Sequence, residues 1–272
     1  MMSKNSKSHG RHRARQLLKP HPLLEHQQST SSSWVAKVIT LFPDMFPGTL
    51  NYSVLGRALR ENIWSMEVIN LRDFGVGKHK DVDDTPSGGG PGMILRPDVV
   101  DNAVAAATKH IGTTKADWPI INLSPRGTPL TQGIAKELSK KSGVILLCGR
   151  FEGIDQRVIE KWKMRELSLG DFVLSGGEIA AQALIDAVVR NIPTVLGNEL
   201  SLKNESFSSG FLEHPQYTKP TNWNGELVPS ILLSGNHAKV YEWQAQKSME
   251  LTINRRPDLL PKSKKPVNSQ DN

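Results

Sequence analysis

The stretch GVILLCGRFEGID, Gly143 to Asp155, joins an apolar run to a loop that contains two glycines and two acids. A short apolar run bounded by glycine predicts a strand that is buried on both faces. Glycine lets main-chain groups approach a ligand closely, so a loop of this kind is suited to holding a small molecule. The stretch therefore predicts a buried strand with a ligand-binding loop at its carboxyl end.

Strand and helix patterns alternate on both sides of this stretch. Strands are predicted at Trp34–Phe42, Met66–Leu71 and Pro119–Ser124, and helices at about Pro47–Asn62, Asp98–Lys109, Pro129–Lys141 and Gly176–Arg190. The long segment from Arg72 to Met93 is rich in glycine and proline, which predicts an irregular, functional loop. The alternation predicts an α/β fold: a parallel sheet with helices on both faces and ligands beyond the carboxyl ends of the strands.

Two more glycine-containing loops follow strands or their equivalents. They are SPRGTP (Ser124–Pro129) and SLGDFVLSGGE (Ser168–Glu178). One such loop alone is more often an ordinary turn, but three in succession favour a ligand site. Neither GxxxxGK[ST] nor GxGxxG, the glycine patterns that bind phosphate, occurs in the chain. An ATPase or a dinucleotide dehydrogenase is therefore disfavoured, and adenine or a similar base without a triphosphate is favoured.

The formal net charge of +7 on 272 residues lies mostly at the two ends of the chain. Residues 1–33 hold six basic residues against one acid, and residues 261–272 hold three against one. The remainder is close to neutral, so net charge alone predicts no nucleic-acid partner. The single cysteine, Cys148, excludes an internal disulfide, and no apolar run approaches the ~20 residues that cross a bilayer. These features predict a cytoplasmic protein without a membrane segment.

The first 33 residues are rich in Ser, His, Gln and basic side chains, which predicts a disordered basic extension. A transit peptide and an over-long start site are alternative interpretations of the same composition. The tail, residues 261–272, is predicted to be disordered as well.

Seven motifs, in order from about Val38 to Leu260, carry a family resemblance. They are LFPDMF (Leu41–Phe46), VDDTPSGGGPGM (Val82–Met93), CGRFEGID (Cys148–Asp155), SLGDFVLSGGE (Ser168–Glu178), FLEHPQYTKP (Phe211–Pro220), LLSGNHAKV (Leu232–Val240) and RRPDLL (Arg255–Leu260). With them the chain resembles the bacterial tRNA (guanine-N1)-methyltransferases, knotted enzymes of the SPOUT class that methylate guanine 37. A single short motif often matches by chance, whereas seven in order rarely do.

The resemblance implies a trefoil-knotted α/β domain at residues 34–196 that binds S-adenosylmethionine. It also implies an interdomain linker at 197–213 and a small helical tRNA-binding domain at 214–260. The protein is then expected to be a homodimer whose active sites lie at the subunit interface. Four basic residues in the C-terminal region provide the local positive charge that phosphate contacts need: Lys239, Lys247, Arg255 and Arg256. The alternative interpretation is that they form a solvated helix face.

The resemblance also implies a requirement for magnesium, for which the sequence shows no site. The long loop contains four potential metal ligands, but their spacing matches no calcium-binding loop. Acidic residues that cap the loop are the default interpretation of this cluster. The four residues are His79, Asp81, Asp83 and Asp84. No metal site is predicted.

The family's methyl-donor contacts transfer to residues of the three glycine loops. These residues are Leu123, Ser124, Pro125, Gly149, Leu169, Gly170, Asp171, Phe172, Val173, Leu174, Gly176 and Gly177. Without the resemblance, the same residues are equally well read as turn and core positions. Glu152 matches a family acid near the donor, where it balances the positive sulfonium or, alternatively, pairs with Arg150 or Arg157.

The proposed chemistry requires a base, because N1 of guanine carries a proton and is a poor nucleophile until that proton leaves. It also requires a cation near O6, where negative charge develops. The family's catalytic aspartate aligns with Glu205, which has the same functional group with one extra methylene, and its arginine aligns with Arg190. The alternatives are a solvated loop acid for Glu205 and a basic residue that favours a helix C-terminus for Arg190.

Two further departures from the family pattern are Phe151, where tyrosine is frequent, and Ser87, where tyrosine often precedes the glycines. Base stacking at position 87 is therefore in doubt. Two other functions remain open at this stage: a knotted methyltransferase with a different RNA target, and an RNA-binding relative without catalysis.

Overall fold

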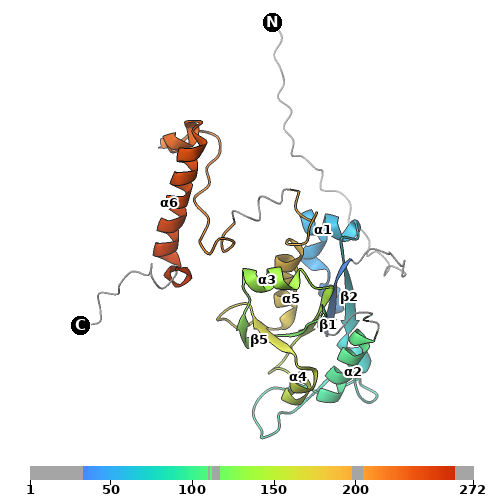
Figure 1. Cartoon of the computed structure of the whole chain (residues 1–272). Coiled ribbons are helices and arrows are strands. Elements are labelled where there is room, and N and C mark those ends of the chain that lie inside the picture. The colour runs from blue at the N-terminus through green and yellow to red at the C-terminus, as the bar shows by residue number, and fades with distance from the viewer. Residues whose placement is uncertain (1–32, 110, 112–116, 198–204, 261–272) are drawn as a thin grey trace, which may run out of the picture. The chain divides into compact units, whose positions relative to one another are not determined.

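The structure is a computed structural model that describes residues 33–109, 111, 117–197 and 205–260. It contains a five-stranded parallel sheet (Figure 1). The strands are β1 (Trp34–Thr40), β2 (Trp64–Asn70), β5 (Ile120–Pro129), β6 (Gly143–Cys148) and β7 (Arg165–Ser168). Their order in the sheet is β2-β1-β6-β5-β7, and every neighbouring pair runs parallel. The predicted strand GVILLC is β6, and all six of its residues are buried. A strand covered on both faces needs such a continuous apolar run.

Helices cover both faces of this sheet, and successive strand residues serve opposite faces. The helices are α1 (Ser53–Arg60), α2 (Pro97–Thr108), α3 (Gln132–Leu138), α4 (Gln156–Trp162) and α5 (Gly177–Val189). Val38 and Leu146 pack with α1, α3 and α5, whereas the next residues, Ile39 and Leu147, pack with α2 and α4. The predicted α/β class with a parallel sheet is confirmed.

Several predicted boundaries were wrong. The helix expected from Pro47 to Asn62 is divided into a 3-10 turn (Gly48–Asn51) and α1, because Tyr52 between them is extended. The segment SPRGTP, predicted as a loop, belongs to β5, whose register with β7 shifts between Leu123 and Thr128. Such bulges are common next to active sites, where they redirect side chains.

The long loop after β2 was expected to lack regular structure, but it contains two short pairings. Val76 pairs with Asp81, and β3 (Asp83–Asp84) pairs antiparallel with β4 (Ile94–Leu95). Short 3-10 helices lie at Pro43–Met45 and Leu71–Phe74. Strand β7 and helix α4 had no counterpart among the predicted elements.

In residues 205–260 the main element is α6 (His237–Arg255), preceded by a hairpin of β8 (Asn222–Trp223) and β9 (Glu226–Leu227). Two 3-10 helices, Ser230–Leu233 and Pro257–Leu259, flank α6. The segment at Leu212 is tied to α6: its N–H donates to Thr252 Oγ1 at 2.9 Å, and its carbonyl accepts from Ser248 Oγ. Among the helices in these described ranges, none combines the length and apolar character needed to cross a bilayer.

Parts of the predicted domain plan lie outside the described residues. The basic extension at 1–33 does so except for Ser33, and so do the tail at 261–272 and residues 198–204 of the linker.

Candidate functional site

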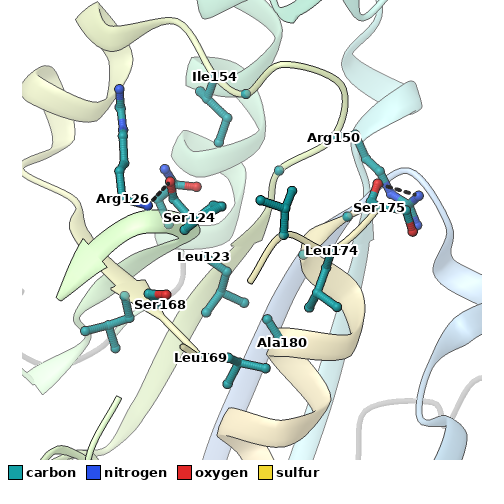
Figure 2. Close-up of a pocket in the computed structure, with 18 of the residues that line it drawn as sticks. Leu123, Ser124, Arg126, Arg150, Ile154, Ser168, Leu169, Leu174, Ser175 and Ala180 are labelled. Carbon is teal, nitrogen blue, oxygen red and sulfur yellow. Dashed lines mark hydrogen bonds between the residues drawn. The ribbon is translucent and has the colours of Figure 1, made fainter. Parts of the chain in front are cut away.

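A pocket of about 370 Å³ lies at the carboxyl ends of β5, β6 and β7 (Figure 2). All three glycine loops line it, at residues 122–126, 149–154, 167–169 and 172–177, together with Ala180 of α5. Leu123 and Leu169 lie beside Ala180 in one part of the pocket, and Ile154 lies toward the opposite part. The parallel sheet thus brings the three loops to one edge, as the alternation of strands and helices predicted.

Most of the predicted donor contacts line this pocket. Leu123, Ser124, Pro125, Gly149, Leu169, Phe172, Val173, Leu174, Gly176 and Gly177 do so. Gly170 and Asp171 do not. Gly170 closes a turn with Ser168, whose hydroxyl accepts from the Gly170 N–H at 3.1 Å and donates to its carbonyl at 3.0 Å. Asp171 is exposed.

Sequence reasoning missed several residues that also line the pocket, including Asn122, Arg126, Ile154, Ser175 and Ala180. Each lies within or next to a predicted loop, so closeness in sequence to that loop was the only signal that could have identified these residues as part of the pocket. Arg126 is held at the pocket by hydrogen bonds to Glu166 at 3.0 Å and Gln156 at 2.8 Å, and neither partner is near it in sequence.

Two adjacent glycines bring the third glycine loop, Ser168–Glu178, close to the end of β6. The N–H of Gly177 donates to the Gly149 carbonyl at 2.9 Å. A Cβ at Gly177 would lie 2.7 Å from Cys148 Cα, and one at Gly176 would lie 2.2 Å from Arg150 Nε. Glycine is therefore required at both positions because a side chain has no room there, and not because the backbone is left-handed.

Glu152 lines the pocket next to the long loop. Its N–H donates to the Met93 carbonyl at 3.0 Å, and a Cβ at Gly92 would lie 2.5 Å from its Cγ. The arginines considered as its partners pair elsewhere: Arg150 with Glu178 at 2.8 Å and Arg157 with Asp155 at 2.7 Å. Glu152 thus lines the pocket without either of those ion pairs, and its Oε1 would lie 2.8 Å from a Cβ at Gly92.

Arg190 and Glu205, predicted separately, form an ion pair. The Arg190 guanidinium donates two hydrogen bonds, of 2.5 and 2.6 Å, to the Glu205 carboxylate. These hydrogen bonds lower the pKa of Glu205 and raise the pKa of Arg190. Lys136, which donates to Ser208 at 3.2 Å, adds a smaller lowering effect on the pKa of Glu205. The carboxylate is therefore ionised at neutral pH.

The ion pair is not part of the pocket. Gly177, at the start of α5, lines the pocket, and Arg190 follows the end of the same helix. With 13 residues at ~1.5 Å each, α5 separates the two by about 20 Å. Within one chain, the predicted base thus lies far from the predicted donor site.

No cluster of three or more His, Cys, Asp or Glu side chains in the described ranges has the arrangement that would hold a metal ion. The acidic stretch of the long loop instead binds protein groups. Arg96 contacts Asp84 at 3.4 Å and Asp98 at 2.9 Å, and the Asp84 carboxylate accepts from the Thr85 N–H.

Comparisons with known proteins agree on one family. A family profile described as tRNA (guanine-1)-methyltransferase, TrmD, matches residues 35–262. The chain is 56% identical over 226 residues to a tRNA (guanine-N(1)-)-methyltransferase of Ruegeria pomeroyi, which covers 83% of this chain and 92% of the relative. Proteins of the same name from Jannaschia sp. and Agrobacterium fabrum are 53% and 52% identical, over 90% and 84% of this chain and 98% and 96% of their own lengths.

Proposed function

Because this chain belongs to the tRNA (guanine-1)-methyltransferase family, we propose that it transfers a methyl group from S-adenosylmethionine to N1 of guanine 37 in tRNA. The observation that carries the proposal is the pocket at the strand ends, which three glycine loops form without any phosphate-binding pattern.

The pocket fits a sulfonium nucleoside in size and in chemistry. Its volume of about 370 Å³ lies within the usual range of small-ligand sites, roughly 300–1,000 Å³. Leu123, Leu169 and Ala180 offer an apolar surface for adenine, and the glycines leave main-chain groups within reach of its polar edge. Glu152 places a negative charge on the pocket lining, which favours a positive sulfonium.

S-adenosylmethionine, when bound, supplies the methyl group. Glu205 would accept the proton from guanine N1, which frees the N1 lone pair to form the new N1–methyl bond. The bond between the sulfonium sulfur and the methyl group would break in the same step, and S-adenosylhomocysteine would leave as a neutral thioether. Arg190 stabilises the negative charge that develops on O6. The contact with Arg190 uses one lone pair on each carboxylate oxygen of Glu205, so the remaining lone pairs stay available for the N1 proton.

A homodimer with active sites at the subunit interface resolves the separation between pocket and base. Within one chain, the length of α5 separates the donor pocket from Arg190 by about 20 Å. A second copy would bring its Arg190 and Glu205 to the first copy's pocket. Large apolar side chains at the pocket and the start of α5 support such an interface: Val173 is 82% exposed, and Phe151, Phe172 and Ile179 are each more than half exposed.

The remaining family features follow in the same proposal. We expect a trefoil knot in residues 34–196, a tRNA-binding domain at 214–260 and a cytoplasmic location. Lys239 and Arg255 lie on α6, where they would contact phosphates. Lys247 and Arg256 would first have to leave Glu250 and Asp258, with which they pair at 2.6 and 2.7 Å. We also expect magnesium to be required, at a site that the described residues do not identify.

The test is methyl transfer from labelled S-adenosylmethionine to tRNA transcripts that carry guanine or another base at position 37. Incorporation only into the guanine transcript, as N1-methylguanine by mass spectrometry, is expected. Equal incorporation into both transcripts would indicate a different RNA target. No incorporation, with or without magnesium, would contradict the enzymatic function and favour a non-catalytic RNA-binding protein.

A further inference from the structure

Glu178, the second residue of α5, is a carboxylate without exposed surface. Its Oε1 accepts a hydrogen bond from Thr40 Oγ1 at 2.8 Å, and its Oε2 lies 2.8 Å from Arg150 Nη2. Burying a charge in a protein core is costly unless it is paired. The start of a helix lowers this cost for an anion, because the helix dipole is positive there. Neither the catalytic step nor the donor contacts proposed above use this carboxylate.

The partner of Glu178 reaches the pocket. Arg150 lines it, and Nη1 of Arg150 donates to the Ser175 carbonyl at 3.2 Å (Figure 2). The guanidinium also stacks on the Phe42 ring, 4.3 Å from its centroid. Gly176 lies so close to Arg150 that a Cβ there would overlap the side chain. The arginine thus lies between the end of β1 and the main chain of the third glycine loop.

The buried Glu178 carboxylate therefore connects the end of β1 with Arg150 and, through Arg150, with the third glycine loop. Thr40 ends β1, Arg150 follows β6, and Ser175 closes the loop after β7. An arginine without a fixed counter-charge has many rotamers, and only a few of them support the Ser175 carbonyl. We propose that Glu178 is a positioning residue for the methyl donor: by fixing Arg150, it fixes the Ser175–Gly176 main chain as one wall of the donor pocket. This inference rests on the proposed function, because it takes S-adenosylmethionine as the occupant.

A second ion pair in the same sheet provides a matched control. Lys37 on β1 is buried, with 9% of its side chain exposed, and it contacts Glu67 on β2 at 2.9 Å. Neither residue lines the pocket. Glu67→Gln therefore removes the carboxylate partner of a largely shielded cation, as Glu178→Gln does, without touching the donor loops, but from a side chain that is 52% exposed.

The experiment compares Glu178→Gln with Glu67→Gln and the unchanged protein. Binding of S-adenosylhomocysteine is measured by calorimetry, KM for donor and for tRNA by initial rates, and stability by thermal melting. We expect Glu178→Gln to weaken S-adenosylhomocysteine binding and to raise the donor KM about tenfold or more, with the tRNA KM unchanged. Glu67→Gln should lower the melting temperature only. Equal donor binding in the two variants would overturn the inference.

A double variant, Glu178→Gln with Arg150→Met, covers the case in which Glu178→Gln alone does not fold. Removing both charges of a buried pair is often neutral for stability, whereas removing one is not. We expect the double variant to recover stability but to bind S-adenosylhomocysteine weakly. Binding as tight as in the unchanged protein would show that the pair has no part in the donor site. If the unchanged protein does not bind S-adenosylhomocysteine at all, the proposed function fails instead.

Discussion

The carboxylate proposed as the base is held, in this structure, by the guanidinium proposed to stabilise the transition state. The two residues are 15 positions apart, and the pair is only partly exposed, with 30% of the Arg190 side chain and 25% of the Glu205 side chain accessible. Each carboxylate oxygen accepts one hydrogen bond from Arg190 and keeps a second lone pair that can accept a proton. In the proposed reaction, the Glu205 carboxylate would therefore contact both Arg190 and guanine N1.

Replacing Glu205 tests its assignment as the base. Glu205→Ala should lower the rate of methyl transfer by ~10²–10⁴-fold, the usual contribution of a general base. Binding of S-adenosylhomocysteine should stay unchanged, because Glu205 does not line the pocket. Glu205→Asp keeps the functional group and should retain part of the activity in the same single-turnover assay. Near-normal turnover in Glu205→Ala would place the base elsewhere.

The lowered pKa of Glu205 predicts a pH-dependent contribution to stability. Because the pKa in the folded state lies below the ordinary value of 4.5, the pair stabilises the fold at pH values above 4.5. This stabilisation is lost as the pH falls through the folded-state pKa. Glu205→Gln should thus cost about 1 kcal/mol at neutral pH and nothing at strongly acidic pH.

Urea unfolding of both proteins between neutral and acidic pH measures this difference. A cost that stays constant over the whole range would mean that the ion pair is absent in solution.

At the scale of elements, the pocket depends on how closely the start of α5 approaches the end of β6. The helix begins at Gly177, and its main chain donates to the Gly149 carbonyl. A side chain at this contact meets backbone atoms, which cannot move aside as a flexible side chain can.

Gly177→Ala should therefore lower both stability and donor affinity. Its Cβ would lie 2.7 Å from Cys148 Cα, so α5 must shift away from the sheet. Overpacking of this kind costs about 1–3 kcal/mol. Gly133→Ala in α3 is the matched control, since the atom nearest to its Cβ would be 3.6 Å away. That change should leave donor binding intact and raise helix stability by at most about 1 kcal/mol. Melting curves and S-adenosylhomocysteine titrations compare the two variants, and equal effects would refute the packing argument.

At the scale of the whole molecule, the length of α5 separates the proposed base from the donor pocket of the same chain. A site assembled from two chains predicts complementation between inactive variants. Gly149→Leu should fill the pocket, because the space next to Gly149 holds no atom closer than 3.8 Å to an added Cβ. Glu205→Ala should remove the base. Each variant alone is expected to be inactive.

Mixed dimers of these two variants should recover activity, since one of their two sites combines an intact pocket with an intact base. Co-expression with two affinity tags isolates such dimers for the methyl-transfer assay. If pocket and base act within one chain, the mixed dimers stay as inactive as their parents.

The sequence by itself determined the fold class, the family and about half of the residues that line the pocket. Apolar runs such as GVILLC and the glycines beside them are local patterns, and a parallel sheet places their loops at one edge. The family resemblance, carried by seven motifs, is confirmed by the comparisons over residues 35–262. The functional assignments of Arg190, Glu205 and the donor contacts stay predictions.

Only the tertiary structure decided which charged side chains meet. The partners of Glu178 lie 138 and 28 positions away, at Thr40 and Arg150, and no local pattern encodes such distances. The tertiary structure also decided that Arg190 pairs with Glu205, that SPRGTP joins β5, and that Gly170 and Asp171 do not line the pocket. Local patterns depend on neighbouring residues along the chain. Ion pairs and strand register depend on how distant segments pack, which periodicity does not specify.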